Sequence, residues 1–300
     1  MQRSFHGALA ALLTPRKSDG TIDEAGFARN IDFILERGVT GVVVAGGTGE
    51  YAAFSMAERK ALFAQAVTAN RGRGALIASA GAMRLDESVD LAAHALGLGA
   101  GAILLPPPHF YHYGQTDLEA FYRAAAERIP GPILLYNLAA FCSPIELDTT
   151  VRLIESVPNI IGVKDSSGDL DTLEMLTARD DLNACRILGH DIALAEALRR
   201  GLLDAVISGP ASVTPEIVAK LFETSQSGDT ERFEKVADLF DELIPQLGYA
   251  PYPAPLKLIA RSRGLFDAAL PFPPSEKQLE GADKFETWLD DWSARFAALA

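Results

Sequence analysis

Short apolar segments alternate with longer amphipathic segments along most of this chain, and this alternation constrains its possible folds more than any other feature. The apolar segments are rich in β-branched residues and end in glycine, proline or small polar residues, as strands that lead into loops do. The expected strands cover residues 7–13, 41–45, 75–80, 101–105, 132–136, 160–164, 186–189 and 205–208. The sequence therefore predicts eight strands.

The segments between these strands carry apolar residues at the three- and four-residue spacing of amphipathic helices. Some of them begin with a recognisable cap, such as Ser55 with Glu58 three residues later. The expected helices cover residues 23–37, 55–70, 85–97, 115–128, 148–156, 169–177, 192–200 and 214–224. A helix is thus expected after each strand.

Strands that are apolar on both faces and alternate with helices require a parallel sheet that the helices cover. Eight such units favour an α/β fold of the closed (β/α)8 TIM-barrel type, and an open doubly wound sheet is the alternative. The glycine-rich segment 45–50 follows the second strand rather than the first and lacks the G-x-G-x-x-G spacing of a dinucleotide site. The barrel is therefore the prediction.

Helical patterns continue after the eighth unit, at residues 229–247, 255–263 and 275–299. The last of these carries aromatic residues along one face, and such a stripe more often packs on its own domain than on another subunit. We expect a catalytic barrel over residues 1–226 and a C-terminal helical segment packed on it over residues 227–300.

Charge and cysteine content exclude several classes of function. The net charge of −13, from 27 basic and 40 acidic residues, leaves no broad basic surface for nucleic acid or anionic membranes. Cys142 and Cys185 have no metal-like spacing, so neither a disulfide framework nor a structural zinc site is expected. No apolar run is long enough for a signal peptide or a membrane span. We therefore expect a cytoplasmic protein without a nucleic-acid or membrane partner.

A lysine ends the expected sixth strand, where the active sites of such barrels lie. Lys164 follows three β-branched residues and is followed at once by Asp165 and two serines. An apolar setting disfavours the ammonium form and leaves a neutral amine that can attack a ketone carbon. The alternative is an ordinary lysine that extends to solvent at a strand end. We hypothesise that Lys164 forms a Schiff base.

Two further segments are expected at the same rim as Lys164. Tyr136 ends the preceding strand, so its phenol could exchange protons with a bound ligand, although a tyrosine there could also simply pack. Residues 46–49 offer backbone N–H groups with little side-chain bulk, which suits a carboxylate. The alternative for this loop is a tight turn in which Thr48 caps the next helix.

Taken together, five short motifs resemble one enzyme family over nearly the whole chain. They are Gly-Gly-Thr-Gly-Glu at 46–50, Leu-Tyr-Asn at 135–137, Gly-Val-Lys-Asp-Ser-Ser-Gly-Asp at 162–169, Gly-His-Asp at 189–191 and Val-Ile-Ser-Gly at 206–209. This set is similar to the dihydrodipicolinate synthase/N-acetylneuraminate lyase family of class I, Schiff-base aldolases. The resemblance implies a (β/α)8 barrel, a helical C-terminal segment, a homo-oligomer (dimer or homotetramer) and no metal or organic cofactor.

The resemblance also implies a role for each matching residue. Lys164 would condense with C2 of pyruvate or a related 2-keto acid, and Tyr136 would relay protons. Gly47 and Thr48 would hold the keto acid's carboxylate through their backbone N–H groups, and Ile207 would offer a carbonyl nearby. An iminium at C2 withdraws electrons, which permits an enamine at C3 and the making or breaking of the C3–C4 bond.

Three departures from the lysine-pathway synthases bear on the second substrate. Gly47 replaces a hydroxyl residue of the proton relay, and Phe110 stands where a neighbouring subunit commonly donates a tyrosine. Phe141 stands where an arginine grips the carboxylate of aspartate semialdehyde in those synthases. These losses favour a lyase that cleaves a 2-keto-3-deoxy sugar acid or a related 4-hydroxy-2-keto acid to pyruvate and an aldehyde.

The alternatives are a 4-hydroxy-tetrahydrodipicolinate (dihydrodipicolinate) synthase, a keto-deoxy sugar acid dehydratase of the same family, or a non-catalytic keto-acid-binding homologue. The candidate contacts to the distal part of the substrate are His109, Phe110, Phe141 and His190. No two histidines have the i, i+4 spacing of a helical metal site, so no metal is expected.

Overall fold

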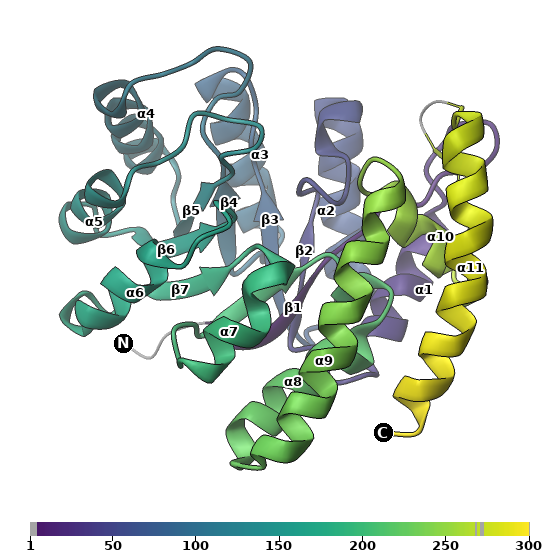
Figure 1. The fold of residues 1–300 in the computed structure, drawn as a ribbon. Coiled ribbons are helices and arrows are strands. Elements are labelled where there is room, and N and C mark those ends of the chain that lie inside the picture. The colour runs from purple at the N-terminus through teal and green to yellow at the C-terminus, as the bar shows by residue number, and fades with distance from the viewer. Residues whose placement is uncertain (1–4, 268, 271–272, 300) are drawn as a thin grey trace.

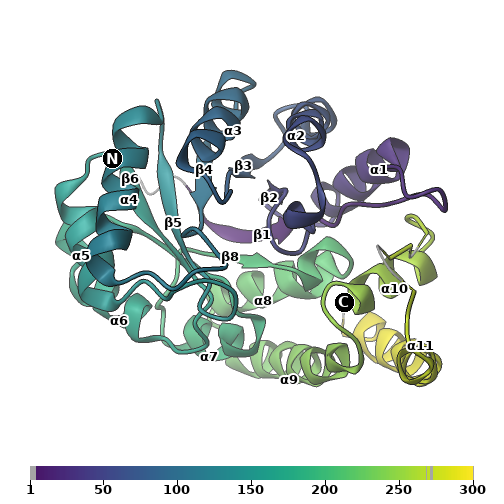
Figure 2. The ribbon, with the colours of Figure 1, turned by 90° about the horizontal axis from the view of Figure 1, so that it is seen from above.

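The computed structural model describes residues 5–267, 269–270 and 273–299, and within them eight parallel strands close into a barrel in the order β1 to β8 (Figure 2). The strands are β1 (Gly7–Ala11), β2 (Gly41–Val44), β3 (Ala75–Ser79), β4 (Ala102–Leu105), β5 (Ile133–Asn137), β6 (Ile160–Asp165), β7 (Cys185–Leu188) and β8 (Ala205–Ser208). The predicted TIM barrel is confirmed. The predictions for residues 1–4 and 300, at the two ends of the chain, lie outside the described residues.

Helices surround the strands on the outside of the barrel (Figures 1 and 2). They are α1 (Glu24–Leu35), α2 (Met56–Asn70), α3 (Leu85–Gly97), α4 (Gln115–Arg128), α5 (Leu147–Ser156), α6 (Asp171–Ala178), α7 (Leu194–Arg199) and α8 (Pro215–Ser227). Helix α2 begins with the predicted cap, since the Ser55 hydroxyl accepts from the Glu58 N–H while the Glu58 carboxylate accepts from the Ser55 N–H. The predicted seventh helix starts late because residues 191–193 form a 3-10 turn, η3 (Asp191–Ala193).

The buried residues form an inner and an outer layer on the two faces of the strands. On β5, Leu134 and Tyr136 belong to the cluster inside the barrel, whereas Ile133 and Leu135 pack with the helices outside. Successive side chains of a strand point to opposite faces, so both faces are apolar and the strand reads as a continuous apolar run. The same alternation directs Ile207 of β8 into the barrel interior.

Three helices follow the barrel, α9 (Thr230–Gln246), α10 (Ala254–Ser262) and α11 (Glu276–Ala297), with a 3-10 turn, η5 (Leu247–Tyr249), after α9. Helix α9 packs on α8, and α11 lies along α9 (Figure 1). The aromatic face of α11 packs within this chain: Trp292 donates to the Leu239 carbonyl at 2.8 Å, and the Phe285 ring lies 5.2 Å from that of Tyr249. This stripe therefore packs α11 on other parts of the C-terminal tail, the segment that follows α8.

A buried ion pair joins the tail to the barrel rim. Lys257 of α10 has a fully buried side chain, and its Nζ lies 2.5 Å from Oε2 of Glu50 and 3.1 Å from the carbonyl oxygen of Ala269. Burial lowers the pKa of Lys257, and the Glu50 carboxylate acts against that shift. Because Glu50 ends the loop after β2, the pair fixes this loop against the segment that leads into α10.

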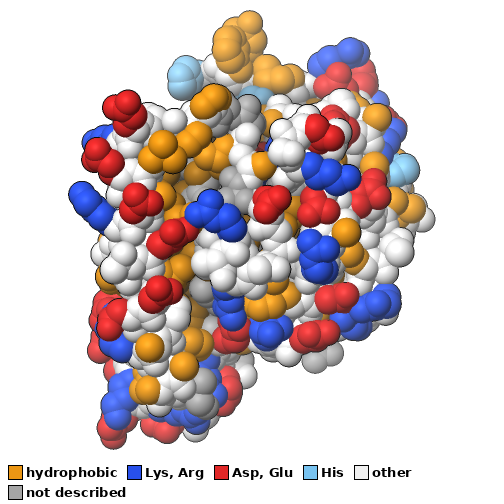
Figure 3. Space-filling model, turned by 90° about the vertical axis from the view of Figure 1, so that its right-hand side faces the viewer, with side chains coloured by type: hydrophobic (Ala, Val, Ile, Leu, Met, Phe, Trp, Pro, Cys, Tyr) orange, Lys and Arg blue, Asp and Glu red, His pale blue; other side chains and the backbone are white. Residues whose placement is uncertain are grey.

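The surface carries charges of both signs. Basic and acidic side chains are interspersed over the face seen in Figure 3, with apolar side chains gathered toward its top. None of the described helices is both long enough and apolar enough to span a membrane.

Replacing Gly162 on β6 should destabilise the barrel, because a Cβ there would lie 2.2 Å from the carbonyl oxygen of Cys185 on β7. We expect Gly162→Ala to lower the free energy of unfolding by about 1–3 kcal/mol, since two strand backbones must move apart. Gly97→Ala is the matched control, because that glycine ends α3 with nothing within 4 Å of its Cβ position. Urea unfolding that gives equal stability for both variants would contradict this packing.

Removing Lys257 should lower the stability of the fold more than removing an exposed lysine of an ion pair does. We expect Lys257→Met to destabilise the fold by about 3–5 kcal/mol, because the buried Glu50 carboxylate then loses its partner. The double variant Lys257→Met with Glu50→Gln should recover part of that loss. Lys235→Met, which breaks an exposed pair with Glu231, should leave stability unchanged. Equal thermal unfolding of the Lys257 and Lys235 variants would refute the role given to the buried pair.

Candidate functional site

Lys164 and Tyr136 are in contact at the carboxyl-terminal rim of the barrel. The parallel pairing of β5 with β6 sets Tyr136 opposite Lys164, and the lysine Nζ lies 3.0 Å from the phenol oxygen. The Nζ also lies 4.1 Å from the centre of the tyrosine ring. Both side chains are only 5% exposed. An amine and a phenol at this distance, largely removed from water, can exchange a proton directly.

Glycine at position 189 makes room for the lysine side chain. A Cβ on Gly189, just after β7, would lie 2.5 Å from the Cε of Lys164 and 2.1 Å from the Oγ of Ser166. A larger residue would displace the amine from the Tyr136 hydroxyl. The glycine of the Gly-His-Asp motif thus contributes to the site through the space it leaves.

A polar network holds the carboxyl-terminal ends of β5 and β6 together next to the site. The Asn137 Nδ2 donates to Oδ2 of Asp165 at 3.0 Å, and the Asn137 Oδ1 accepts from the Ile145 N–H at 3.1 Å. The other carboxylate oxygen of Asp165 accepts from the Ser167 N–H at 2.8 Å. The residues that follow Tyr136 and Lys164 in sequence therefore fix the strand ends on which these two side chains stand.

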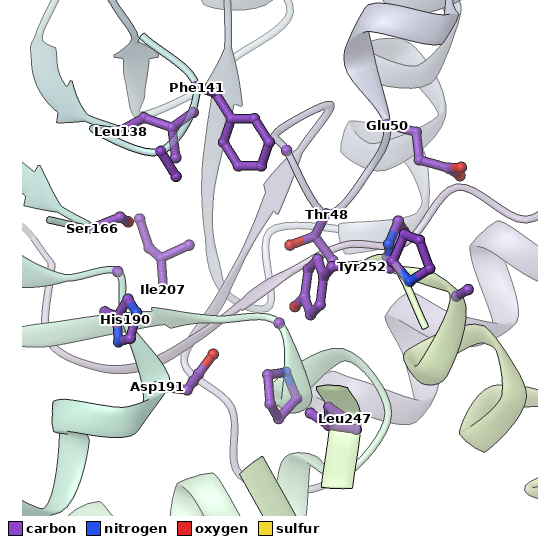
Figure 4. A pocket seen from close by; sticks show the side chains of 18 of the residues that line it. Thr48, Glu50, Leu138, Phe141, Ser166, His190, Asp191, Ile207, Leu247 and Tyr252 are labelled. Atoms are coloured by element: carbon purple, nitrogen blue, oxygen red, sulfur yellow. The ribbon is translucent and has the colours of Figure 1, made fainter. Parts of the chain in front are cut away.

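Lys164 lines a cavity of about 790 Å³. Figure 4 shows this cavity with ten of its lining residues labelled. The loops after β2, β4, β5, β6, β7 and β8 line it, together with the segment between η5 and α10. The predicted site residues on its wall are Lys164, Tyr136, Gly47, Thr48, Ile207, His109, Phe141 and His190. Phe110 is not on this wall and is 79% exposed, so its contact with a substrate stays a prediction.

The loop after β2 presents backbone donors to the cavity. The N–H groups of Gly49 and Glu50 close the turn by donating to the carbonyls of Gly46 and Gly47 at 3.1 and 2.9 Å. The N–H groups of Gly47 and Thr48 have no partner among the described residues. Ala45 and Glu50 bound the loop with φ of 53° and 57°, in the left-handed region. Such a concave set of amides suits an anion, as the sequence predicted for these positions.

Four residues of the cavity wall each carry a polar atom without a hydrogen-bond partner among the described residues. These atoms are Ser166 Oγ, His109 Nδ1, His190 Nδ1 and Asp191 Oδ1, and all four are buried. Buried polar groups are normally hydrogen-bonded, so these four atoms are exceptions in this region of the chain. Among the described residues, no cluster of three or more histidine, cysteine, aspartate or glutamate side chains could hold a metal.

Two ionisable residues of the cavity were not predicted as site residues. Burial raises the pKa of Asp191 to about 6, against the effects of a hydrogen bond from Ser208 and of the Lys164 charge. Burial of the hydroxyl, and then the Asp191 charge, raises the pKa of Tyr252 above its usual value, while hydrogen bonding with Thr48 acts in the opposite direction. Tyr252 is half exposed overall, and its hydroxyl points into the cavity (Figure 4).

Only weak signals in the sequence point to these two residues. Asp191 lies in the Gly-His-Asp motif, in which only His190 is a predicted substrate contact. Tyr252 lies in the proline-rich segment before α10, which reaches the cavity only because the tail folds back over the barrel rim.

Comparisons with known proteins agree with this geometry. The sequence model of the dihydrodipicolinate synthetase family matches residues 4–290. A 4-hydroxy-tetrahydrodipicolinate synthase of Thioalkalivibrio sulfidiphilus is 33% identical over 270 residues, which cover 90% of this chain and 91% of the relative.

Solved structures extend the comparison to the fold. The dihydrodipicolinate synthase of Aquifex aeolicus matches with a TM-score of 0.89 at 26% identity, over 96% of this chain and 98% of that one. The chloride-inhibited enzyme of Acinetobacter baumannii, solved with pyruvate, matches with a TM-score of 0.87 at 27% identity, over 95% and 98% of the two chains. The chain therefore belongs to the dihydrodipicolinate synthetase family, whose members are Schiff-base, pyruvate-dependent enzymes of the class I aldolase type.

Proposed function

We propose that Lys164 forms an imine with the keto carbon of pyruvate, and that the derived enamine makes or breaks a carbon–carbon bond to an aldehyde. The observation that carries the proposal is the 3.0 Å contact between the Lys164 amine and the Tyr136 hydroxyl in a buried site. The amine attacks C2, and the phenol protonates the oxygen that leaves as water. The iminium then loses a C3 proton to give the nucleophilic enamine.

Pyruvate would bind with its carboxylate on the N–H groups of Gly47 and Thr48, which have no partner among the described residues. Ile207 would present its carbonyl from the end of β8 on another part of the wall. The lysine itself supplies the electron sink, so this chemistry requires neither a metal nor an organic cofactor. We expect the enzyme to act as a cytoplasmic homo-oligomer.

Two candidates compete for the aldehyde. The names of the relatives favour the 4-hydroxy-tetrahydrodipicolinate synthase, the alternative in the sequence analysis, over the sugar-acid lyase preferred there. We therefore take the condensation of pyruvate with aspartate semialdehyde as the first candidate. One observation keeps the lyase as the second: the described residues of the cavity wall include no arginine, and Phe141 lies there 75% exposed. Dehydratase activity and non-catalytic binding are the remaining alternatives.

Borohydride reduction in the presence of pyruvate tests the imine. We expect mass spectrometry to find a reduced pyruvate adduct on the peptide that contains Lys164. Lys164→Arg should abolish the adduct, and Tyr136→Phe should slow its formation by on the order of 10²-fold, because the proton donor is lost. Lys60→Arg, a surface variant remote from the cavity, is the control and should react as the wild type does. An adduct on another lysine, or none, would refute the proposal.

A substrate panel separates the candidates, and Phe141→Arg sharpens the comparison. An arginine at this place on the wall would supply a bidentate partner for the carboxylate of aspartate semialdehyde. We expect Phe141→Arg to raise kcat/KM for that aldehyde about tenfold or more. Ile192→Arg, at another exposed apolar position of the wall, is the control and should not.

The wild-type protein decides between the two candidates. Efficient condensation of aspartate semialdehyde with pyruvate supports the synthase. Pyruvate release from 2-keto-3-deoxy acids, with little condensation of the semialdehyde, supports the lyase. Loss of water without pyruvate release would identify a dehydratase, and turnover of none of these compounds would contradict both candidates. A Phe141→Arg variant with no gain would contradict the role given to that position.

A further inference from the structure

Asp191 and Tyr252 are ionisable groups of the cavity that the imine chemistry above does not use. They reach it from separate parts of the chain, Asp191 from η3 after β7 and Tyr252 from the segment before α10. Figure 4 shows the Tyr252 ring beside Thr48, with its hydroxyl end and the Asp191 carboxylate both facing the cavity. Both residues share this cavity wall with Lys164 and Tyr136.

Both groups converge on Gly209, the residue after β8. The backbone of Gly209 lies close enough to the Asp191 carboxyl to lower its pKa, against the effect of burial. The Tyr252 hydroxyl occupies the place where a side chain of Gly209 would begin, since a Cβ there would lie 1.4 Å from the phenol oxygen. Gly209 has a φ of −69°, which any residue can adopt, so the close approach of the phenol accounts for glycine at this position. The structure thus holds the phenol and the carboxylate over one residue.

The route from this pair back to the reacting amine is short and polar. The Thr48 side chain is a hydrogen-bonding neighbour of Tyr252, and the Tyr136 phenol lies close enough for its charge to affect Tyr252. Gly47 has no side chain, and the Tyr136 hydroxyl is the nearest atom to its Cβ position, at 3.8 Å. Residue 47 therefore places no bulk between Tyr136 and Tyr252. Hydroxyl groups can pass protons because each both donates and accepts.

The proposed reaction needs a group that takes up and releases protons near neutral pH. Tyr136 works best if the proton that it takes up can move on to a second acceptor. The ionisable groups that share the cavity wall with Asp191 are Lys164, Tyr136, Tyr252 and Tyr51, with His190, His109 and Glu50. Burial raises the pKa of Asp191 to about 6, which matches this requirement.

We propose that Tyr252 and Asp191 form a proton relay, in which the Tyr252 hydroxyl carries protons between the Tyr136 side of the cavity and the Asp191 carboxylate. The relay rests on the proposed function, because it serves the imine and enamine steps at Lys164. It uses residues of one chain only, so the site carries its own proton acceptor.

The enamine step moves one proton along the relay. The C3–H bond of the pyruvate iminium breaks, and its electron pair becomes the C2–C3 double bond of the enamine while the iminium nitrogen becomes neutral. The C3 proton goes to the Tyr136 oxygen as the original Tyr136 proton moves through the hydroxyls of Thr48 and Tyr252 to the Asp191 carboxylate. The net result is transfer of one proton from C3 to Asp191. Reversal returns a proton to C3.

Deuterium exchange into pyruvate tests the relay without knowledge of the aldehyde. Pyruvate alone is incubated with the protein in D₂O, and loss of its methyl proton signal is followed by NMR over a range of pH. Borohydride trapping measures imine formation in the same samples. The variants are Tyr252→Phe, Asp191→Asn and Gly209→Ala, the last of which should displace the Tyr252 hydroxyl without backbone strain.

Two controls outside the cavity wall match the first two variants. Tyr249→Phe removes a phenol whose pKa burial raises to about 12, and Asp241→Asn removes a carboxylate whose pKa burial raises. Neither residue lines the cavity, so both controls should exchange deuterium at the wild-type rate.

The relay predicts that all three variants still give the trapped adduct on Lys164 but exchange deuterium about tenfold or more slowly. Wild-type exchange should rise with pH through about 6, because Asp191 accepts a proton only when ionised. Asp191→Asn should remove this rise, and Gly209→Ala should reproduce the slow exchange of Tyr252→Phe.

Wild-type rates in Tyr252→Phe and Asp191→Asn, with the pH dependence intact, would overturn the relay while leaving the imine proposal standing. Absence of a trapped adduct in the wild-type protein would overturn both. Thermal melting of each variant separates slow exchange from loss of fold, and a Gly209→Ala protein that melts like the wild type but exchanges slowly would support the relay independently.

Discussion

The pairing of two parallel strands is the constraint on which this site depends. Because β5 and β6 run side by side with Tyr136 opposite Lys164, the barrel brings a phenol and an amine to 3.0 Å without help from a flexible loop. Strand positions are held by backbone hydrogen bonds and by apolar packing on both faces, so this contact is more rigid than one built on loops. Burial of both groups then makes proton exchange between them chemically useful.

The walls around this pair are joined by longer-range contacts. The loop after β2 offers its amides to the cavity, and Glu50 at the end of that loop is paired with Lys257 of α10. The segment just before α10 supplies Tyr252, whose hydroxyl fits over Gly209 at the end of β8. The tail therefore does more than cover the barrel. It contributes the Tyr252 hydroxyl to the cavity, and its Lys257 side chain fixes the loop after β2.

The sequence predicted the barrel and the amine because local patterns determine both. A β-branched run that ends at Lys164 is visible in the chain itself, and so is the cap at Ser55 that begins α2. Each predicted strand also differs from the observed one by no more than two residues at either end. Fold class and the position of the reactive lysine follow from such short-range signals.

The rest of the site depends on contacts between residues far apart in the chain, which periodicity does not reveal. Tyr252 gains its place by packing over Gly209, and the Lys257 side chain finds Glu50 only after the tail has folded. A match to a sequence motif also does not place a side chain in the cavity, as Phe110 shows. The motif predicts that Phe110 contacts a substrate. Phe110 is 79% exposed, has a φ of 84° in the left-handed region, and is not among the residues that line the cavity of this chain.

A crystal structure of the protein soaked with pyruvate would show whether Lys164 forms the imine. We expect continuous density from the Lys164 Nζ to C2 of pyruvate, with the Tyr136 hydroxyl in contact and the carboxylate on the N–H groups of Gly47 and Thr48. Pyruvate bound without a covalent bond to Lys164, or bound away from the Tyr136 hydroxyl, would contradict this expectation.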